Sequence, residues 1–420
     1  MSGPHQTDVL VVGAGPTGLV AALSLAEAGL SVEVIDEEWR PAGHSYALAL
    51  HPRSIGVLAE LGLAQDAIAQ GQKLESLTIL TGEEKRDTLR CAVLDERFPF
   101  LLALPQSALE ALLADRLAKK GIKVRWSHRL AGLEPKGDTV TATVERLEKE
   151  SSGYAVAHTE WLVGETLSFR ARFLIGADGH RSLVRRALGT AFDETGPSQA
   201  FAIFECTAPG AGDEMRLVID RASVNALWPL PGGRARWSLE LKDPDVSAAD
   251  RFKSRLTTML GEHFFPHLDE VRTRELVRER APWFEKGAMD IGWSIEVRFE
   301  HRLAESFGRG RVWLAGDAAH LTGPAGMQSM NAGLAEAHDL SARIKRIREG
   351  QAGLDLLDAY GRERRADWSF LLGRRGGLRA GASASEFVAQ NASRLLQCLP
   401  ATGTDLPPLA AQLGLDVERG

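Results

Sequence analysis

The sequence predicts an α/β protein in which a nucleotide-binding sheet is interrupted by an inserted β-sheet domain and followed by C-terminal helices. The glycine-rich turn 13–18 directly follows the apolar run Val9–Val12, and a second apolar run ends in Asp36. The region from about 190 to 300 is rich in short alternating segments. The first two observations predict a strand–turn–helix–strand unit that binds a dinucleotide, and the third predicts the inserted sheet.

Each residue of the glycine-rich turn suits a phosphate-binding loop. Gly13 permits the tight turn, Gly15 lets the backbone approach a pyrophosphate, and Gly18 lets the helix pack closely on the strand. Pro16 and Thr17 complete the turn, and the amides of the first helical turn are expected to face the phosphates. The sequence therefore predicts that all five residues belong to a cofactor site.

Asp36 extends this pattern, because it stands 23 residues after Gly13 at the end of the second predicted strand. A carboxylate at this place is expected to accept hydrogen bonds from a ribose diol. We assign the adjoining Glu37 to the same site. A glycine pattern alone is weak evidence, but two flanking strands and the acid favour a dinucleotide over an incidental turn.

Further elements follow from periodicity and from glycine or proline signals. We expect helices at 52–63, 106–117 and 332–348, one or two more at 354–375, a helix within 190–300, and strands at 124–126, 140–144, 154–158, 166–171, 173–176 and 311–315. The last stretch, 400–420, is richer in proline and glycine and is expected to lie loosely on the surface. The tryptophans at 228, 237, 283 and 293 are interpreted as core residues that also have the size to wall a pocket.

Composition excludes several classes of protein. The net charge of −6 argues against nucleic acid as a partner, because no basic excess is available to neutralise phosphates. The three cysteines, Cys91, Cys206 and Cys398, fit neither a disulfide framework nor a metal site. We see no signal peptide and no apolar stretch of about 18 residues, so we expect a cytoplasmic protein without a membrane segment.

Three separated motifs stand in a recognisable order: 13–18, then 176–185 (GADGHRSLVR), then Gly316-Asp317-Ala318-Ala319-His320 with Pro324 and Gly326. Together they resemble the FAD-dependent aromatic hydroxylases, the group A flavoprotein monooxygenases typified by para-hydroxybenzoate hydroxylase, over about residues 7 to 370. The resemblance implies a Rossmann-like FAD-binding domain of the glutathione-reductase type. We assign that domain to 1–72, 104–189 and 301–348, the inserted substrate domain to 73–103 and 190–300, and a C-terminal helical region and tail to 349–420.

The resemblance also implies roles for individual residues. Asp36 matches the acid that binds the adenosine ribose, and Gln106 matches the glutamine beside the ribityl chain. Asp178 and Gly179 match the motif near the pyrophosphate and the NAD(P)H path, and Asp317, after Gly316, matches the aspartate that binds the ribityl hydroxyls. The segment 324–331 matches the loop and helix start that face the flavin pyrimidine edge; from it we assign Pro324, Gly326, Ser329, Met330 and Asn331 to the cofactor site.

Two departures from the family pattern affect these expectations. Tyr46 stands where relatives usually have an arginine that contacts the FAD phosphates or the nicotinamide cofactor, so we look to Arg53 or His44 for that charge. Glu336-Ala337-His338-Asp339 stands where relatives commonly show aspartate and asparagine, a change that we interpret as remote from the chemistry. His320 is interpreted as a packed histidine behind the site rather than an acid or base.

The resemblance implies an FAD-dependent monooxygenase that uses NADPH or NADH and O2 to hydroxylate or epoxidise an aromatic or polyketide-like molecule through a flavin C4a-hydroperoxide. No catalytic base is identified, and Baeyer–Villiger oxidation remains open. The alternatives are an FAD oxidoreductase of the same fold that does not insert oxygen, and a non-catalytic flavin-binding protein. We expect a monomer or homodimer in secondary metabolism, without the thioredoxin-like domain of some relatives.

Overall fold

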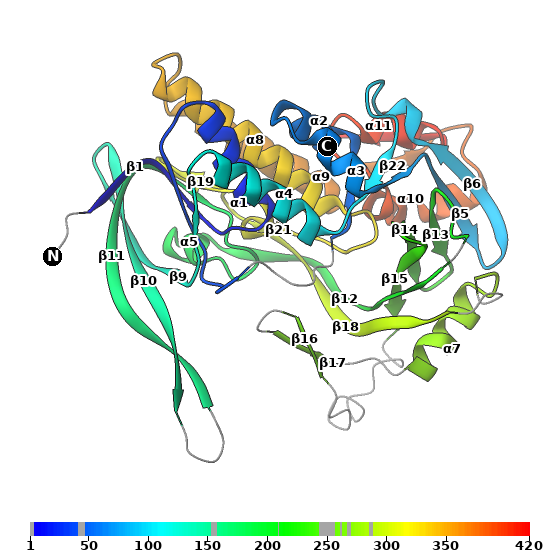
Figure 1. Cartoon of the computed structure of the whole chain (residues 1–420). Coiled ribbons are helices and arrows are strands. Elements are labelled where there is room, and N and C mark those ends of the chain that lie inside the picture. The colour runs from blue at the N-terminus through cyan, green and yellow to red at the C-terminus, as the bar shows by residue number, and fades with distance from the viewer. Residues whose placement is uncertain are drawn as a thin grey trace.

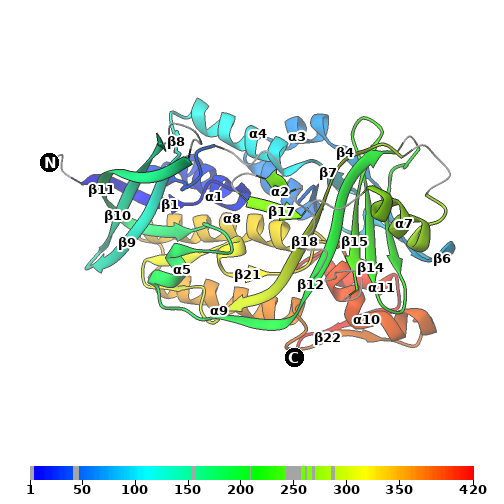
Figure 2. The ribbon, with the colours of Figure 1, turned by 90° about the horizontal axis from the view of Figure 1, so that it is seen from below.

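The computed structural model describes residues 4–40, 47–152, 158–208, 210–242, 257–260, 263–266, 270–284 and 289–420. Two eight-stranded sheets lie at opposite ends of the molecule, and two long strands of the second sheet run between them (Figure 2). Helices cover the first sheet, and a C-terminal group of elements covers part of the second (Figure 1). The mixed α/β architecture predicted from the sequence is confirmed.

The first sheet has the order β19-β20-β11-β1-β2-β8, with β10 and β9 continuing beyond β11. Its strands are β1 (His5–Val12), β2 (Val32–Ile35), β8 (Val124–Arg125), β9 (His128–Lys136), β10 (Thr139–Ser152), β11 (His158–Gly176), β19 (Gly308–Arg309) and β20 (Val312–Leu314). The pairs β11–β1, β1–β2, β2–β8 and β11–β20 are parallel. Val9–Val12 is buried throughout, as expected for a parallel strand covered on both faces.

The helices of this half pack on the first sheet and on one another. They are α1 (Pro16–Glu27), α2 (Pro52–Glu60), α3 (Ala64–Gln70), α4 (Gln106–Lys119), α5 (Leu183–Ala187), α8 (Gln328–Arg348) and α9 (Asp355–Leu371). Helix α1 contacts both α8 and α4, so the glycine-rich turn at its start lies beside segments more than 300 residues away in the sequence. Gly29, with φ +78°, follows the end of α1.

The second sheet has the order β21-β18-β12-β15-β14-β13-β5-β6. Its strands are β5 (Ser76–Thr81), β6 (Glu84–Arg90), β12 (Phe192–Thr207), β13 (Glu214–Ile219), β14 (Val224–Leu230), β15 (Arg234–Leu241), β18 (Ile291–Ala304) and β21 (His320–Leu321). The segment 73–103, which we assigned to the substrate domain, thus contributes two strands to this sheet. Trp228 and Trp237 are fully buried, and helix α7 (Glu270–Arg280) packs on the Trp237 side.

Smaller elements complete the chain. They are the three-stranded sheet β3 (Ala49–Leu50), β7 (Leu101–Ala103) and β4 (Gln72–Leu74), the hairpin β16 (Thr257–Leu260) and β17 (His263–Pro266), and the single-turn helices Cys91–Val93 and Gly316–Ala318. Among the described residues, no helix is long and apolar enough to cross a membrane.

The expectation of a small sheet of short strands between 124 and 171 is wrong in part. Strands β10 and β11 are single long strands that pair along most of their length and form a projecting hairpin (Figure 1). No turn interrupts β11 between residues 158 and 176, and residues 154–157 of the predicted strand lie outside the described part. Side chains still alternate where β11 first pairs with β1 at 169–172, and the continuous apolar run begins at Phe173, within the parallel pair.

The expectation that residues 400–420 lie loosely on the surface is also wrong. This stretch forms α11 (Leu406–Ala411) and β23 (Leu415–Glu418), which pairs with β22 (Gly377–Ala380) beside α10 (Glu386–Cys398). Leu406, Leu409, Leu413 and Leu415 are buried in the main core. The proline and glycine residues of the stretch bound short elements whose apolar faces are covered.

Candidate functional site

The glycine-rich turn is held by contacts that leave no room for side chains at two of its positions. Gly13 has φ +104°, and a Cβ built there would lie 2.2 Å from the carbonyl oxygen of Ala177. A Cβ at Gly18 would lie 1.9 Å from the carbonyl oxygen of Gly13. At Gly15, by contrast, an added Cβ would meet nothing within 4 Å, because this residue faces a cavity.

The three sequence motifs converge at this point. The second motif touches the first through Ala177. The third touches it through Thr17, whose Oγ1 lies 2.7 Å from where a Cβ of Gly316 would be. Arg185, which is buried, joins the second and third motifs by donating to the carbonyl oxygens of Ala318 at 2.7 Å and His180 at 2.8 Å.

A cavity of about 540 Å³, here called cavity A, opens at the carboxyl ends of β1 and β2. Of the predicted cofactor residues it is lined by Gly13, Gly15, Asp36, Glu37, Gln106, Asp178 and Gly179. Trp126, His128 and Trp161 from the β8–β11 region form another part of its wall. Sequence analysis did not assign these three aromatic residues to the site, because strands far from the glycine turn carry them.

Asp36, the residue after β2, lines cavity A. Its Oδ2 accepts a hydrogen bond from the Ala14 amide at 2.6 Å, and its Oδ1 accepts one from the Glu38 amide at 2.8 Å. Burial raises the pKa of Asp36 above its ordinary value, and the nearby Glu37 and Asp178 carboxylates act in the same direction. The carboxylate thus fixes the turn that follows β1 while it faces the cavity.

Asp178 also lines cavity A and binds the first turn of helix α5, whose N-cap residue is Ser182. Its Oδ1 accepts from Ser182 Oγ at 2.6 Å, and its Oδ2 accepts from the amides of Leu183 and Val184 at 2.7 and 3.1 Å. Burial raises the pKa of this carboxyl. The next residue, Gly179, has φ +70°, a conformation that favours glycine.

Gln106 and Glu110 stand side by side on α4. Gln106 Nε2 donates to Glu110 Oε1 at 2.7 Å. Burial, together with the Asp36 carboxylate, raises the pKa of Glu110 to about 7. Sequence analysis missed Glu110, which lines cavity A one helical turn after Gln106.

A second cavity of about 660 Å³, cavity B, adjoins cavity A, because Gln106, His180 and Arg181 line both. Of the predicted residues, Asp317, Pro324, Ser329 and Met330 also line cavity B. Helix α8 begins at Gln328, after Met327 in the left-handed conformation with φ 52°, so the positive end of its dipole opens on this cavity. The three shared lining residues make the two cavities neighbours, with the glycine-rich turn on one and the start of α8 on the other.

Two predicted residues of the 324–331 segment hold the loop rather than line the cavities. Asn331 is buried; its Oδ1 accepts from the His51 amide at 2.7 Å, and its Nδ2 donates to Ala49 and Met327. Gly326 packs against the end of α10, where a Cβ would lie 2.8 Å from the Leu399 carbonyl oxygen. Sequence analysis missed His51, whose Nε2 lies 3.0 Å from the Gly326 carbonyl oxygen.

Four further predicted residues line neither cavity, namely Pro16, Thr17, Gly18 and Gly316. Arg53 lies elsewhere. It is exposed on α2, lines neither cavity, and has its guanidinium near Gly403. The prediction that Arg53 supplies the missing charge is therefore not supported by its position, since the second residue of α2 points away from the site. His44 and Tyr46 lie outside the described residues.

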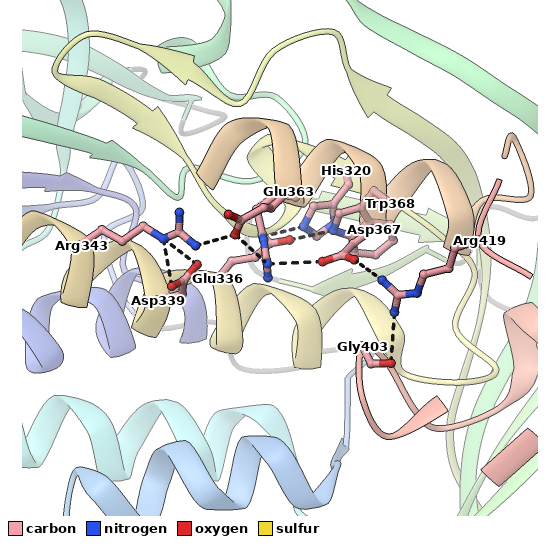
Figure 3. A network of polar contacts seen from close by, with 10 residues as sticks. His320, Glu336, Asp339, Arg343, Glu363, Asp367, Trp368, Gly403 and Arg419 are labelled. Carbon is pink, nitrogen blue, oxygen red and sulfur yellow. Dashed lines mark hydrogen bonds and ion pairs between the residues drawn. The ribbon is translucent and has the colours of Figure 1, made fainter. Parts of the chain in front are cut away.

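His320 is the centre of a buried polar network behind cavity B (Figure 3). Its ring stacks on Trp368 with centroids 3.7 Å apart, and its Nε2 lies 2.9 Å from Glu336 Oε2. Glu336 also accepts from Trp368 Nε1 at 2.7 Å and from the Gly316 amide at 2.9 Å. Burial acts to raise the pKa of Glu336, but His320 and these donors have the larger combined effect, so the pKa lies below its ordinary value.

The network reaches the cavity wall through Ser329. The Ser329 hydroxyl donates to Asp317 Oδ1 at 2.6 Å and lies 3.5 Å from His320 Nδ1. His320 is thus packed behind the site, where we expected it. Glu336 is not remote from the site, because it holds the amide of Gly316, the residue before Asp317.

Comparison with known proteins places the chain among flavoproteins. A family described as FAD binding domain matches residues 6–369. The chain is 30% identical over 369 residues to the 6-methylpretetramide 4-monooxygenase of Streptomyces rimosus, with 86% of this chain and 60% of that protein covered. It is 31% identical to the rifampicin monooxygenase of Streptomyces venezuelae, with 85% of this chain and 68% of that protein covered.

Solved structures agree in fold. The p-nitrophenol 4-monooxygenase PnpA of Pseudomonas putida superposes with a TM-score of 0.74 at 23% identity, covering 98% of this chain and 93% of that one. The rebeccamycin biosynthetic enzyme RebC superposes with a TM-score of 0.68 at 25% identity, covering 94% and 73%. The chain therefore belongs to the FAD binding domain family, as its resemblance to the FAD-dependent aromatic hydroxylases implies.

Proposed function

We propose that this protein is an FAD-dependent monooxygenase that uses NAD(P)H and O2 to oxygenate an aromatic or polyketide-like molecule. The observation that carries the proposal is that the start of helix α8 lines cavity B together with apolar residues of the second sheet. The names of the relatives support it, since they are monooxygenases of 6-methylpretetramide, rifampicin and pentachlorophenol. Because the matched part spans only 60% of the first of these relatives, the activity remains a proposal.

The residues present fit FAD. Gly15 leaves an open face where a pyrophosphate would approach the amides of α1, and Asp36 lies at the end of cavity A that suits the adenosine ribose. Gln106 and Asp317 lie where a ribityl chain would pass from cavity A to cavity B. The flavin ring would then lie in cavity B, within reach of Pro324 and Met330.

Bound FAD supplies the redox chemistry with oxygen that no side chain can supply. The chain's own contribution is electrostatic and steric. The positive end of α8 stabilises negative charge on the pyrimidine side of a reduced ring, and this field is in place before the reaction begins.

The wall of cavity B opposite α8 indicates the class of substrate. Val297, Phe299 and Phe192 from β18 and β12 present apolar surface, and Phe299 packs edge-on against Phe201 with centroids 5.6 Å apart. Arg181 and Arg298 add positive charge at the rim. An aromatic molecule that carries an oxygen substituent suits this combination of surfaces.

The test uses the FAD-loaded protein with NADPH or NADH under 18O2 and a panel of hydroxylated aromatic compounds. We expect one 18O atom in each product molecule and one in water, with one NAD(P)H oxidised. Oxidation of NAD(P)H with no label in any organic product would contradict oxygenation and favour the oxidoreductase alternative. Loaded protein that neither nicotinamide reduces would favour the non-catalytic alternative.

We further propose a cytoplasmic location. The three cysteines are buried and free, a state that suits a reducing compartment. We propose a monomer or homodimer, which sedimentation of the FAD-loaded protein tests.

A further inference from the structure

Glu110 brings a carboxyl group to cavity A with one oxygen that has no partner. The residue lies on α4 one turn after Gln106, and only 5% of its surface is exposed. Its Oε1 accepts from Gln106 Nε2 at 2.7 Å. Within the described part of the chain, Oε2 has no hydrogen-bond partner, and it is not one of the unpartnered polar atoms that are sealed from solvent. Because Glu110 lines cavity A, Oε2 is open to a molecule that fills this cavity.

No cation compensates the charge of this carboxyl group. Among the described residues, no lysine, arginine or histidine forms an ion pair with Glu110. Burial raises its pKa to about 7, with the Asp36 carboxylate acting in the same direction and the Gln106 amide acting against it. The carboxyl group therefore changes its charge near neutral pH, while it faces the cavity.

The other titratable groups around Glu110 come from four elements. Those that line cavity A with it are Asp36, Glu37, Glu38 and Arg40 after β2, His128 and Arg129 on β9, and Asp178, His180 and Arg181 before α5. Helices α1 and α3 pack on α4 and carry one acid each, Glu27 and Asp66. Glu27 pairs with Arg116 and Lys120 at the other end of α4, and Asp66 is exposed. Of all these charges, the one that acts on the pKa of Glu110 is Asp36, another acid.

The pyrophosphate of FAD is expected in the same cavity, because the open face of Gly15 lines it. Its negative charges would repel an ionised Glu110 as Asp36 does, and this repulsion favours the protonated carboxyl group. A phosphate oxygen has no hydrogen to donate, so it forms a hydrogen bond with Glu110 only when the proton is on the carboxyl group. A ribose hydroxyl, by contrast, would donate to the ionised carboxylate and would leave no reason for a proton to bind.

We propose that Glu110 binds FAD in its protonated form and donates a hydrogen bond from Oε2 to a pyrophosphate oxygen, so that FAD binding takes up a proton from solvent. This inference rests on the part of the proposed function that assigns FAD to cavity A. Gln106 orients the carboxyl group by donating to Oε1, which leaves Oε2 to carry the hydrogen. The affinity for FAD is then highest below the pKa of Glu110 in the apoprotein, and it falls as pH rises above that value.

Calorimetric titration of the apoprotein with oxidised FAD measures the proton uptake directly. The titration at pH 7.5 is repeated in phosphate and in Tris buffer, whose ionisation enthalpies differ, and the FAD dissociation constant is measured from pH 6 to 9. We compare the wild type with Glu110→Gln, which is neutral and still has an N–H group to donate, and with Glu110→Met, which is neutral and has none. Asp115→Asn is the matched control, since Asp115 lies on the same helix, lines none of the three cavities and pairs with Lys119 at the surface.

We expect the wild type and the control to take up about 0.7 of a proton per FAD at pH 7.5, and their dissociation constants to rise about 8-fold from pH 7.5 to 8.5. Both effects should disappear in Glu110→Gln, which should therefore bind FAD more tightly than the wild type at pH 8.5. Glu110→Met should lose both effects too, but it should bind FAD about 10-fold more weakly than Glu110→Gln at every pH, because it cannot donate to the phosphate.

The absence of proton uptake in the wild type would overturn the proposal. Uptake that persists in Glu110→Gln would also overturn it, since His128 or His180 would then be the source of the pH dependence. Equal affinities of Glu110→Gln and Glu110→Met would contradict the hydrogen bond. If one variant does not fold, the other still decides whether Glu110 takes up the proton. FAD that binds without proton uptake refutes this inference alone, whereas a protein that does not bind FAD refutes the proposed function as well.

Discussion

Two alanine variants in the glycine-rich turn, Gly15→Ala and Gly13→Ala, should affect different properties. We expect the first to weaken FAD binding and the second to destabilise the fold. At Gly15 the backbone is ordinary, with φ −71° and ψ 179°, and an added methyl group meets no protein atom within 4 Å. We expect Gly15→Ala to leave the apoprotein as stable as the wild type, or about 0.5 kcal/mol more stable because the unfolded chain loses freedom. The methyl group instead occupies the place where a phosphate oxygen would meet the backbone.

The expected loss is therefore confined to binding. Losing one charge-assisted hydrogen bond from an amide to a phosphate costs about 1.5–3 kcal/mol, which corresponds to an increase in the FAD dissociation constant of about 10- to 150-fold. Gly13→Ala behaves differently, because its methyl group would collide with the Ala177 backbone in a conformation with positive φ. We expect the free energy of unfolding of this apoprotein to fall by about 3–5 kcal/mol.

The assay pairs two measurements on each variant. Urea unfolding of the apoprotein gives stability, and quenching of flavin fluorescence on titration gives the FAD dissociation constant. Unchanged FAD affinity in Gly15→Ala would refute the placement of the phosphates at this turn. An apoprotein destabilised by Gly15→Ala would refute the inference that Gly15 faces open space.

Three further predictions concern buried polar groups. Glu336→Gln leaves the His320 imidazole without its carboxylate, so we expect the free energy of unfolding of the apoprotein, measured with urea, to fall by about 3 kcal/mol. FAD affinity should weaken as well. An unchanged urea midpoint together with unchanged FAD affinity would contradict the role of the network. Glu110 has a pKa raised to about 7 and binds a proton more tightly when folded, so stability should decrease as pH rises from about 4.5 to 7 by at most about 3 kcal/mol. Glu110→Gln should lose this part of the pH dependence, and equal pH profiles of unfolding would contradict it. Arg185→Lys replaces the two guanidinium nitrogens that reach separate carbonyl oxygens with a single nitrogen that cannot occupy both positions. We therefore expect a loss of about 2 kcal/mol in urea unfolding, and an unchanged midpoint would show that the bridge contributes nothing.

The parts of the site that sequence analysis found are those that a local backbone rule dictates. Gly13 and Gly18 are recognisable because a tight turn against a neighbouring strand allows no side chain, and Asp36 because it ends the next strand. The order of the three motifs further indicated which distant segments meet. These rules depend only on short stretches of chain, and Gly13, Gly18 and Asp36 follow them in the structure.

The parts that it missed depend on which side chains meet in space. Glu336 and His320 are separated by 16 residues, and nothing in either segment indicates that they share a buried hydrogen bond. Arg53 was chosen for its nearness to Tyr46 in the sequence, but the direction of α2 takes it toward Gly403. The tail 400–420 was misjudged because its prolines and glycines were weighed above its regularly placed leucines.

The account's central claim is that one FAD molecule spans cavities A and B with its ring at the start of α8. A crystal structure of the FAD-loaded protein tests this claim most directly. We expect the pyrophosphate within hydrogen-bond distance of the backbone N–H groups of Gly15 or Thr17, and the pyrimidine edge against the Met327–Met330 segment. A flavin ring outside cavity B, or an adenosine end far from Asp36, would contradict the claim.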